Sequence, residues 1–275
     1  MWDQGEHLHQ TQEWVVGRVL DRQASRRPDK VCIRVVDGPE LTFAGADLAS
    51  RQVAQLLGSV GILPGDRVAV MLPNGLDHCV VWFGASRAGA VLVSVNTEYK
   101  GGFLTHVLNN SGARVLVVHD RYLDAIRAVE DEVPALETLL VCGEDQGGGF
   151  RLLETLSFDR YRTLDGLEPV AEVSYRDDAC IMYTSGTTGP SKGVLMPHAH
   201  LYLFGLGTIE HLGVGPNDVF YVVLPMFHAN ALFMQIYACL IAGATALVRE
   251  RFSASAWLPD VRHYGATLTN SLGAV

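Results

Sequence analysis

Short apolar runs and helical patterns alternate along residues 41–142, and this alternation restricts the fold more than any other feature of the sequence. Apolar runs occupy residues 68–72, 90–95, 115–118 and 138–141. Runs that are apolar throughout are typical of strands buried on both faces, and strands separated by helices pair in parallel through crossover connections. The predicted fold class is therefore α/β, with largely parallel sheet flanked by helices.

Helical patterns fill the intervals between these strands. Thr42 is suited to cap a helix, because its hydroxyl can accept a hydrogen bond from a backbone N–H of the first turn. The apolar positions of that helix lie near helical spacing: Leu48, Val53, Leu56, Leu57 and Val60. Further helices are predicted through Trp82 to Gly89, over residues 103–108 and over residues 122–130.

The alternation is interrupted between residues 143 and 178. This stretch contains three consecutive glycines at 147–149, many charges and few periodic apolar positions, so we expect a surface connection. Beyond it, strands are predicted at 179–183, 194–196, 219–224, 244–248 and 266–269, and helices at 199–211 and 231–241. The sequence thus predicts two lobes, residues 1–170 including the connection and residues 171–275.

Charge and cysteine content exclude two classes of function. The chain has 21 Lys and Arg residues against 30 Asp and Glu residues, a net charge of −9, and no basic run. Binding to nucleic acid through its phosphates is therefore not expected. The five cysteines are isolated from one another, which is typical of a reduced, cytoplasmic protein and argues against a structural zinc site.

One segment is long enough to raise the question of a membrane span. Residues 219–248 contain no Asp, Glu, Lys or Arg. Pro225, His228, Asn230 and Gln235 interrupt the run, and its first part reads as a strand. We therefore predict a buried strand, a loop and a core helix here, and no membrane-spanning helix.

The segment from Tyr183 to Gly193 is the most informative for function. It holds five Ser or Thr hydroxyls, three glycines and Lys192 directly after a predicted buried strand. Glycine allows backbone N–H groups to approach an anion closely, hydroxyls add donors, and a lysine adds a positive charge suited to phosphate. This composition predicts a loop that binds a polyphosphate.

Other interpretations of this loop account for less of it. The spacing does not fit the Gly-Lys-Ser/Thr phosphate loop, and Gly186, Gly189 and Gly193 do not fit the dinucleotide-binding pattern. A flexible surface turn would explain the glycines and some hydroxyls. It would not explain the lysine or so many donors beside a buried strand.

The loop resembles the signature of the AMP-forming adenylating superfamily, which includes acyl-CoA synthetases, adenylation domains of nonribosomal peptide synthetases, and firefly luciferase. Residues 224–230, Leu-Pro-Met-Phe-His-Ala-Asn, are similar to the Pro-x-Phe-His segment of that family. Within the family, this residue pattern most resembles that of fatty-acid and carnitine/crotonobetaine-type CoA ligases. Residues 41–43, 65–69 and 87–90 resemble its N-terminal lobe. Pro190-Ser191 departs from the usual proline directly before the lysine.

The resemblance implies a two-step reaction and a set of roles. A carboxylate would attack the α-phosphorus of ATP to give an acyl-adenylate and pyrophosphate, and a thiol, that of coenzyme A or of a carrier protein, would then displace AMP. The residues assigned to the ATP phosphates are Thr184, Ser185, Gly186, Thr187, Thr188, Gly189 and Lys192. Lys192 and His228 are the expected catalytic residues, with His228 beside the acyl carboxylate. Magnesium would arrive with ATP, since no cluster of metal-ligand residues is visible.

His198 and His200, which follow the loop, lack the support of a motif and are expected at the surface.

The resemblance also predicts groups that these 275 residues do not contain: a Tyr-Gly-x-Thr-Glu segment, a ribose-binding aspartate and an adenylating lysine. We therefore expect the chain to be inactive alone and to cover apolar surface by forming a homodimer or by associating with the missing C-terminal part. The alternative is a non-catalytic nucleotide-binding or interaction protein derived from the same fold.

Overall fold

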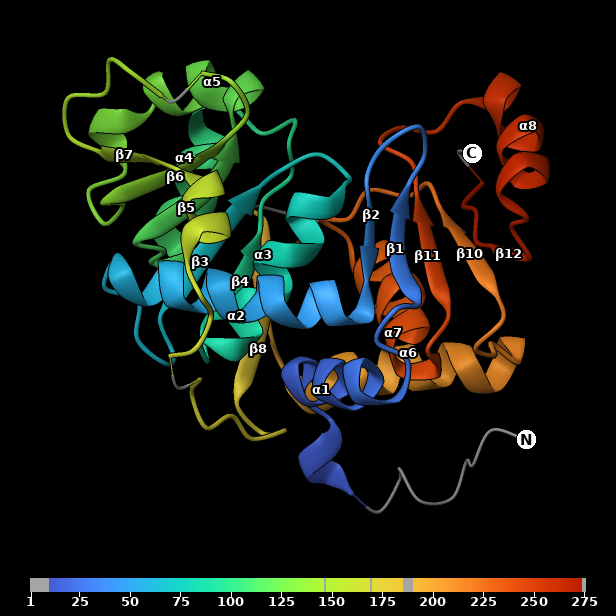
Figure 1. Ribbon diagram of the computed structural model, residues 1–275. Coiled ribbons are helices and arrows are strands. Elements are labelled where there is room, and N and C mark those ends of the chain that lie inside the picture. Colours follow the sequence, from blue (N-terminus) through green and yellow to red (C-terminus); the bar gives the residue numbers. More distant parts are fainter. Residues whose placement is uncertain (1–9, 146, 169, 185–189, 274–275) are drawn as a thin grey trace.

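The computed structural model describes residues 10–145, 147–168, 170–184 and 190–273, which form two β-sheets separated and covered by helices (Figure 1). The first sheet has seven strands in the order β7-β6-β5-β3-β4-β8-β9, and the second has five in the order β12-β10-β11-β1-β2. Neighbouring strands pair in parallel except for β8 with β9 and β1 with β2. The predicted α/β class with largely parallel sheets is confirmed.

The strands of the first sheet are β3 (Arg67–Met71), β4 (Val91–Ser94), β5 (Val115–His119), β6 (Thr138–Cys142), β7 (Glu154–Ser157), β8 (Asp178–Thr184) and β9 (Lys192–Pro197). Those of the second sheet are β1 (Val31–Val35), β2 (Glu40–Thr42), β10 (Val219–Val222), β11 (Thr245–Val248) and β12 (Leu268–Thr269). The α-helices are α1 (Val16–Arg26), α2 (Phe43–Ser59), α3 (Leu76–Arg87), α4 (Gly101–Ser111), α5 (Leu123–Arg127), α6 (His198–Leu212), α7 (Ala238–Ala242) and α8 (Ala254–Tyr264).

Alternation along each strand divides its side chains between an inner and an outer core. In β3, Val68 and Val70 belong to the large cluster between the sheets, whereas Ala69 and Met71 face the outer layer that contains α4 and α5. In the second sheet, Phe220 of β10 faces inward and its neighbour Tyr221 packs against residues of α8. The result is five layers, helix, sheet, helix, sheet, helix, with the largest core in the middle.

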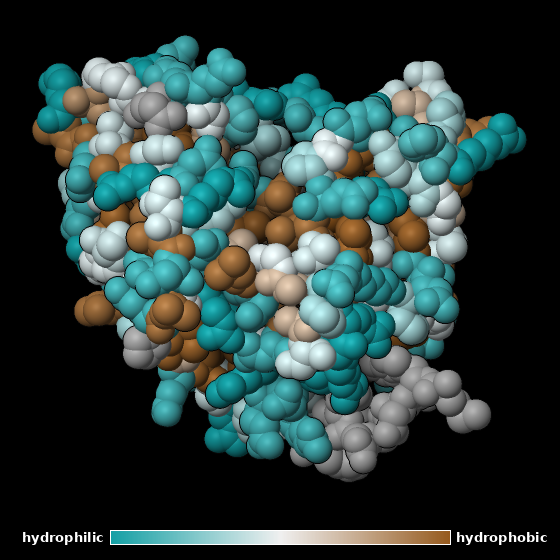
Figure 2. All heavy atoms as spheres, in the orientation of Figure 1, coloured by the Kyte–Doolittle hydropathy of each residue, from teal (hydrophilic) through white to brown (hydrophobic). Residues whose placement is uncertain are grey.

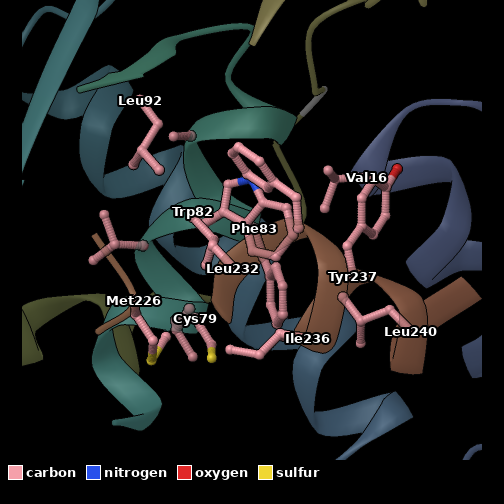
Figure 3. Close-up of a cluster of buried hydrophobic side chains, with 14 of the residues drawn as sticks. Val16, Cys79, Trp82, Phe83, Leu92, Met226, Leu232, Ile236, Tyr237 and Leu240 are labelled. Carbon is pink, nitrogen blue, oxygen red and sulfur yellow. The ribbon is translucent and has the colours of Figure 1, made fainter. Parts of the chain in front are cut away.

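Aromatic side chains fill this central layer. Trp82 of α3 lies at the centre, with its ring 5.7 Å from that of Phe233 and 5.4 Å from that of Tyr237. Figure 3 shows Trp82 and Tyr237 among apolar side chains from several elements, including Val16 of α1 and Leu92 of β4. Trp82 and Tyr237 are fully buried, so the two sheets are joined by a close-packed interior.

Local signals explain where several of these helices begin and end. The Thr42 side chain accepts a hydrogen bond of 3.1 Å from the Gly45 N–H, which confirms the predicted cap of α2. The predicted helix over 231–241 differs, because residues Asn230–Tyr237 form a π-helix that continues into α7. Periodicity predicts that a segment is helical but does not distinguish one helical hydrogen-bond pattern from another.

The stretch between residues 143 and 178 is more than a surface connection. It adds β7 to the edge of the first sheet and forms a 3-10 helix, Phe158–Thr163. Phe158 and Tyr161 of that helix are buried in the central core. The sequence pattern does not indicate this burial, because the residues around Phe158 and Tyr161 are mostly charged and face solvent.

The two sheets do not follow the order of the chain. β8 and β9 complete the first sheet, although they follow residue 170, and β1 and β2 complete the second sheet, although they lie near the N-terminus. The division into residues 1–170 and 171–275 stays a prediction. Within the residues that the structure describes, no helix combines the length and hydrophobicity needed to cross a membrane.

Close packing of α2 on α3 makes Gly84 a sensitive position. A Cβ atom added at Gly84 would lie 2.5 Å from Cβ of Val53, and nearer still to its Cγ1 atom. We expect Gly84→Ala to lower the free energy of unfolding by about 2 kcal/mol, measured by urea denaturation, because the two helices must move apart. Gly58→Ala, in the same helix pair, is the control.

A Cβ atom at Gly58 meets nothing within 4 Å. The control variant should therefore be neutral or up to about 1 kcal/mol more stable, because alanine favours the helix. Equal effects of the two substitutions would contradict the packing argument.

Candidate functional site

The predicted phosphate loop connects the two strands of a β-hairpin. β8 pairs with β9 in antiparallel register, with Tyr183 opposite Gly193 and Thr184 opposite Lys192. Thr184 and Lys192 are exposed at the two ends of the connection, and the Thr184 hydroxyl lies 3.5 Å from the Lys192 carbonyl. The two strands predicted on either side of the loop are confirmed and form a hairpin stem. Ser185, Gly186, Thr187, Thr188 and Gly189 lie outside the described residues.

Helix α4 holds the base of this hairpin in place. The Tyr183 hydroxyl donates to Oδ1 of Asn110 over 2.8 Å, and the His106 ring contacts the Tyr183 ring edge-on. Nε2 of His106 also lies 2.8 Å from the backbone carbonyl of Ser191. Both strand ends are therefore tied to one helix, so the loop starts from a rigid support.

Gly193 allows the two strands to lie close together beneath the loop. A Cβ atom at this position would lie 2.9 Å from Cγ2 of Ile181 and 3.2 Å from Cζ of Tyr183. A larger residue would displace the Tyr183 ring, whose hydroxyl contacts α4. The glycine that ends the sequence motif therefore has a packing function in addition to any role near phosphate.

His228 lies on the other sheet, after the end of β10. Its backbone N–H donates to the Pro225 carbonyl over 3.1 Å, and its carbonyl accepts from Leu232 at the start of the π-helix. The side chain is exposed and its ring lies 4.6 Å from that of Phe227. Neighbouring atoms remove part of the ring's hydration, which lowers the pKa of His228.

A cavity of about 290 Å³ opens between the carboxyl ends of the two sheets. Pro225 and Phe227 line one side of it, and residues that follow β3 and β4, including Asn74 and Thr97, line the other. Apolar residues show at the surface between the two sheets in the middle of the face drawn in Figure 2. Ligands of open parallel sheets bind at the carboxyl ends of the strands, so this position fits a substrate site.

The end of β8 that leads into the loop lies at the same edge of the first sheet as this cavity. β8 is the neighbour of β4, and Ser94 pairs with Met182, two residues before Thr184. Thr97, three residues beyond Ser94, lines the cavity. The end of β8 that leads into the predicted phosphate loop and this part of the cavity wall therefore lie at one edge of the first sheet. His228 directly follows Phe227, which lines the cavity from the side of the second sheet.

Asn74 is a site residue that the sequence motifs do not single out. Its side chain is 9% exposed and makes three hydrogen bonds to the backbone of the segments that follow β10 and β11. A polar side chain shortly after a buried parallel strand could have indicated such a site residue, because these positions meet at the carboxyl edge of the sheet.

His198, which was expected at the surface, is 1% exposed, so that expectation was wrong. His200 is exposed as expected.

No group of three or more His, Cys, Asp or Glu side chains is placed to hold a metal ion in the part of the chain that the structure describes.

Known proteins with similar sequences and structures agree on one family. The sequence matches the AMP-binding enzymes over residues 20–275. It is 33% identical over 218 residues to the long-chain-fatty-acid–CoA ligase FadD13 of Mycobacterium tuberculosis, covering 78% of this chain and 41% of that protein. It is 30% identical to long-chain fatty acid transport protein 2 of Rattus norvegicus, covering 93% of this chain and 41% of that protein.

Solved structures lead to the same conclusion. The N-terminal domain of FACL13 from Mycobacterium tuberculosis superposes with a TM-score of 0.85 at 26% identity, covering 94% of this chain and 63% of that one. The anthranilate CoA ligase AuaEII, solved with anthranoyl-AMP, gives a TM-score of 0.83 at 25% identity, covering 93% and 49%. The chain spans about two fifths of the length of the curated relatives it matches. With the five-layered fold, the hairpin loop and the match over residues 20–275, the chain belongs to the family of AMP-binding enzymes.

Proposed function

We propose that this chain forms the N-terminal part of an AMP-forming acyl-CoA ligase and supplies its ATP-phosphate loop. The observation that carries the proposal is the loop that ends at Lys192, which lies on a hairpin at the carboxyl edge of a parallel sheet in an AMP-binding enzyme. The relatives named as long-chain-fatty-acid–CoA ligases support a fatty or other organic acid as substrate.

The first step needs charge neutralisation more than proton transfer. A carboxylate is already ionised at neutral pH, so its oxygen can attack the α-phosphorus of ATP without a general base, and the bond to the pyrophosphate oxygen breaks. Thr184 and Lys192, with the donors of Ser185, Gly186, Thr187, Thr188 and Gly189, would stabilise the negative charge on the leaving pyrophosphate. Magnesium, bound through phosphate oxygens, would neutralise further charge.

The second step transfers the acyl group to a thiol. The sulfur of coenzyme A would attack the acyl carbon, the bond from that carbon to the phosphate oxygen of AMP would break, and the thiol proton would pass to solvent. Phe227 lines the cavity and His228 is the next residue of the segment that follows β10, so we assign both to the acyl side of the adenylate. Because its pKa is lowered, His228 would be neutral at pH 7 and would not compete with Lys192 for the phosphates.

Replacing His228 tests the acyl assignment. In the enzyme that carries this chain as its N-terminal part, we expect His228→Ala to lower the rate of acyl-CoA formation about tenfold, the kinetic equivalent of one lost contact of about 1.4 kcal/mol. The thermal unfolding midpoint should change little, because the side chain is exposed. The control is His200→Ala, which removes an exposed imidazole from α6.

Exchange between ATP and pyrophosphate, measured with a panel of carboxylic acids, tests the proposed function as a whole. Acid-dependent exchange would support adenylation, and the acid that gives the fastest exchange would identify the substrate class. ATP binding without exchange for any acid would instead favour the non-catalytic nucleotide-binding protein. Self-association and a cytoplasmic location stay predictions, and light scattering of the purified chain would test the first.

A further inference from the structure

Asn74 joins the two sheets at the edge of the cavity. It follows β3 of the seven-stranded sheet, and its partners lie in the segments that follow β10 and β11 of the five-stranded sheet. Its Nδ2 donates to the Leu224 carbonyl over 2.8 Å and to the Arg249 carbonyl over 3.2 Å. Its Oδ1 accepts from the Met226 N–H over 2.7 Å. A single side-chain amide therefore holds the ends of β10 and β11 together.

The burial of Asn74 makes these contacts difficult to replace. The side chain is 9% exposed, and the partner residues Leu224 and Met226 are 3% and 0% exposed. Truncating Asn74 would leave the Leu224 carbonyl and the Met226 N–H without this partner, away from bulk water. An ion pair of 2.7 Å between Arg121 and Glu250 also links the two sheets, but it is exposed and screened by solvent.

The residues fixed by Asn74 lead directly to His228. Met226 is anchored through its N–H, the next residue, Phe227, lines the cavity, and the His228 N–H is bound to the Pro225 carbonyl. After His228 the π-helix begins, and Oδ1 of Asn230 accepts hydrogen bonds from Gln235 and Asn270. His228 is thus held between two anchored segments, and the anchor on its N-terminal side belongs to the other sheet.

We propose that Asn74 is a positioning residue that fixes the segment from Leu224 to His228 across the two sheets and so sets the wall of the acyl site. The catalytic role of this positioning rests on the proposed function. The geometry that it describes can be tested without turnover. Loss of the geometry and loss of the activity are therefore distinguishable.

The test compares the purified chain with its Asn74→Ala variant by NMR. We expect amide hydrogen exchange at Met226 and His228 to become at least about tenfold faster, because the segment opens locally when its anchor is removed. The ring resonances of His228 should move, and its pKa should rise toward the usual histidine value as the ring becomes more hydrated. The amides of β3 should keep their protection.

Two further variants make the result decisive. Gln23→Ala removes another buried amide, whose Nε2 donates to the Ile241 carbonyl over 2.8 Å, and should lower stability without altering the His228 signals. Asn74→Asp keeps the acceptor for the Met226 N–H but sets a carboxylate oxygen against the Leu224 and Arg249 carbonyls, so it should move the His228 signals at least as far as alanine does. Asn74→Ser, which is small and uncharged, replaces the alanine variant if that variant does not fold. Unchanged His228 signals and exchange in the Asn74 variants, or changes equal to those of Gln23→Ala, would overturn the proposal.

Discussion

Replacing Lys192 by alanine should, under the proposed function, lower the rate of ATP–pyrophosphate exchange about a hundredfold in an enzyme that contains this chain. Lys192 is exposed at the end of the hairpin connection, and among the described residues no carboxylate forms an ion pair with it, so its charge is available to a ligand. A charge that stabilises the leaving pyrophosphate matters most in the transition state, so kcat should fall more than KM rises.

Two control variants separate the position of the charge from its presence. Arg160→Ala removes an exposed positive charge from the 3-10 helix Phe158–Thr163 and should leave exchange unchanged. Lys192→Arg keeps the charge but alters its geometry, so we expect an intermediate rate. If Lys192→Ala exchanged at the normal rate with normal affinity for ATP, the phosphate role of this lysine would be wrong.

The sequence predicted the parts of the fold that depend on local patterns. Buried parallel strands are apolar throughout, so β3, β4, β5 and β6 could be located within one or two residues. The β8–β9 hairpin could be predicted because a glycine-rich, polar stretch separates two apolar runs. In both cases the signal lies within one short, continuous stretch of the chain.

Features that depend on distant residues could not be predicted in this way. Pairing of β1 with β11 joins residues more than 200 positions apart, and no local pattern encodes that choice of partner. Asn74 reads as a turn residue until the carbonyls of Leu224 and Arg249 are placed beside it. His198 reads as a surface residue because its burial depends on what packs against α6. The predicted phosphate loop could therefore be recognised from consecutive residues. The cavity wall could not, because it is formed by residues that are distant in the sequence.

Two buried histidines should make the chain unstable in mild acid. His78 of α3 and His198 of α6 are each 1% exposed, and burial lowers the pKa of each to about 4. For His198 the nearby charge of Asp177 offsets part of this effect. In the unfolded chain both imidazoles would have a pKa near the usual 6.5, so unfolding takes up protons between pH 6.5 and pH 4.

The direction of the effect follows from this proton uptake. Where the unfolded state binds more protons, stability increases with pH, so the full stability is present above about pH 6.5 and is lost as the pH falls toward 4. Each histidine would contribute about 3 kcal/mol to that loss at pH 4. The loss from both lies at the lower end of the 5–15 kcal/mol that stabilises a typical domain. Urea denaturation at a series of pH values between 4 and 7.5 would measure it.

Substitution of each histidine assigns the loss to its source. We expect His78→Gln and His198→Gln each to reduce the slope of stability against pH by about 1.4 kcal/mol per unit between pH 4 and 6.5, because a neutral amide takes up no proton on unfolding. His200→Gln, which removes an exposed imidazole from the same helix as His198, is the matched control.

The carboxyl groups of Asp120 and Glu137 would add their own loss of stability at more acidic pH. Backbone N–H donors lower the pKa of Asp120, and Arg114 lowers the pKa of Glu137. A stability that stayed constant from pH 7 to pH 4.5 would show that the two imidazoles are hydrated or hydrogen-bonded well enough to be protonated in the folded chain, and would contradict the burial of His78 and His198 in the central core.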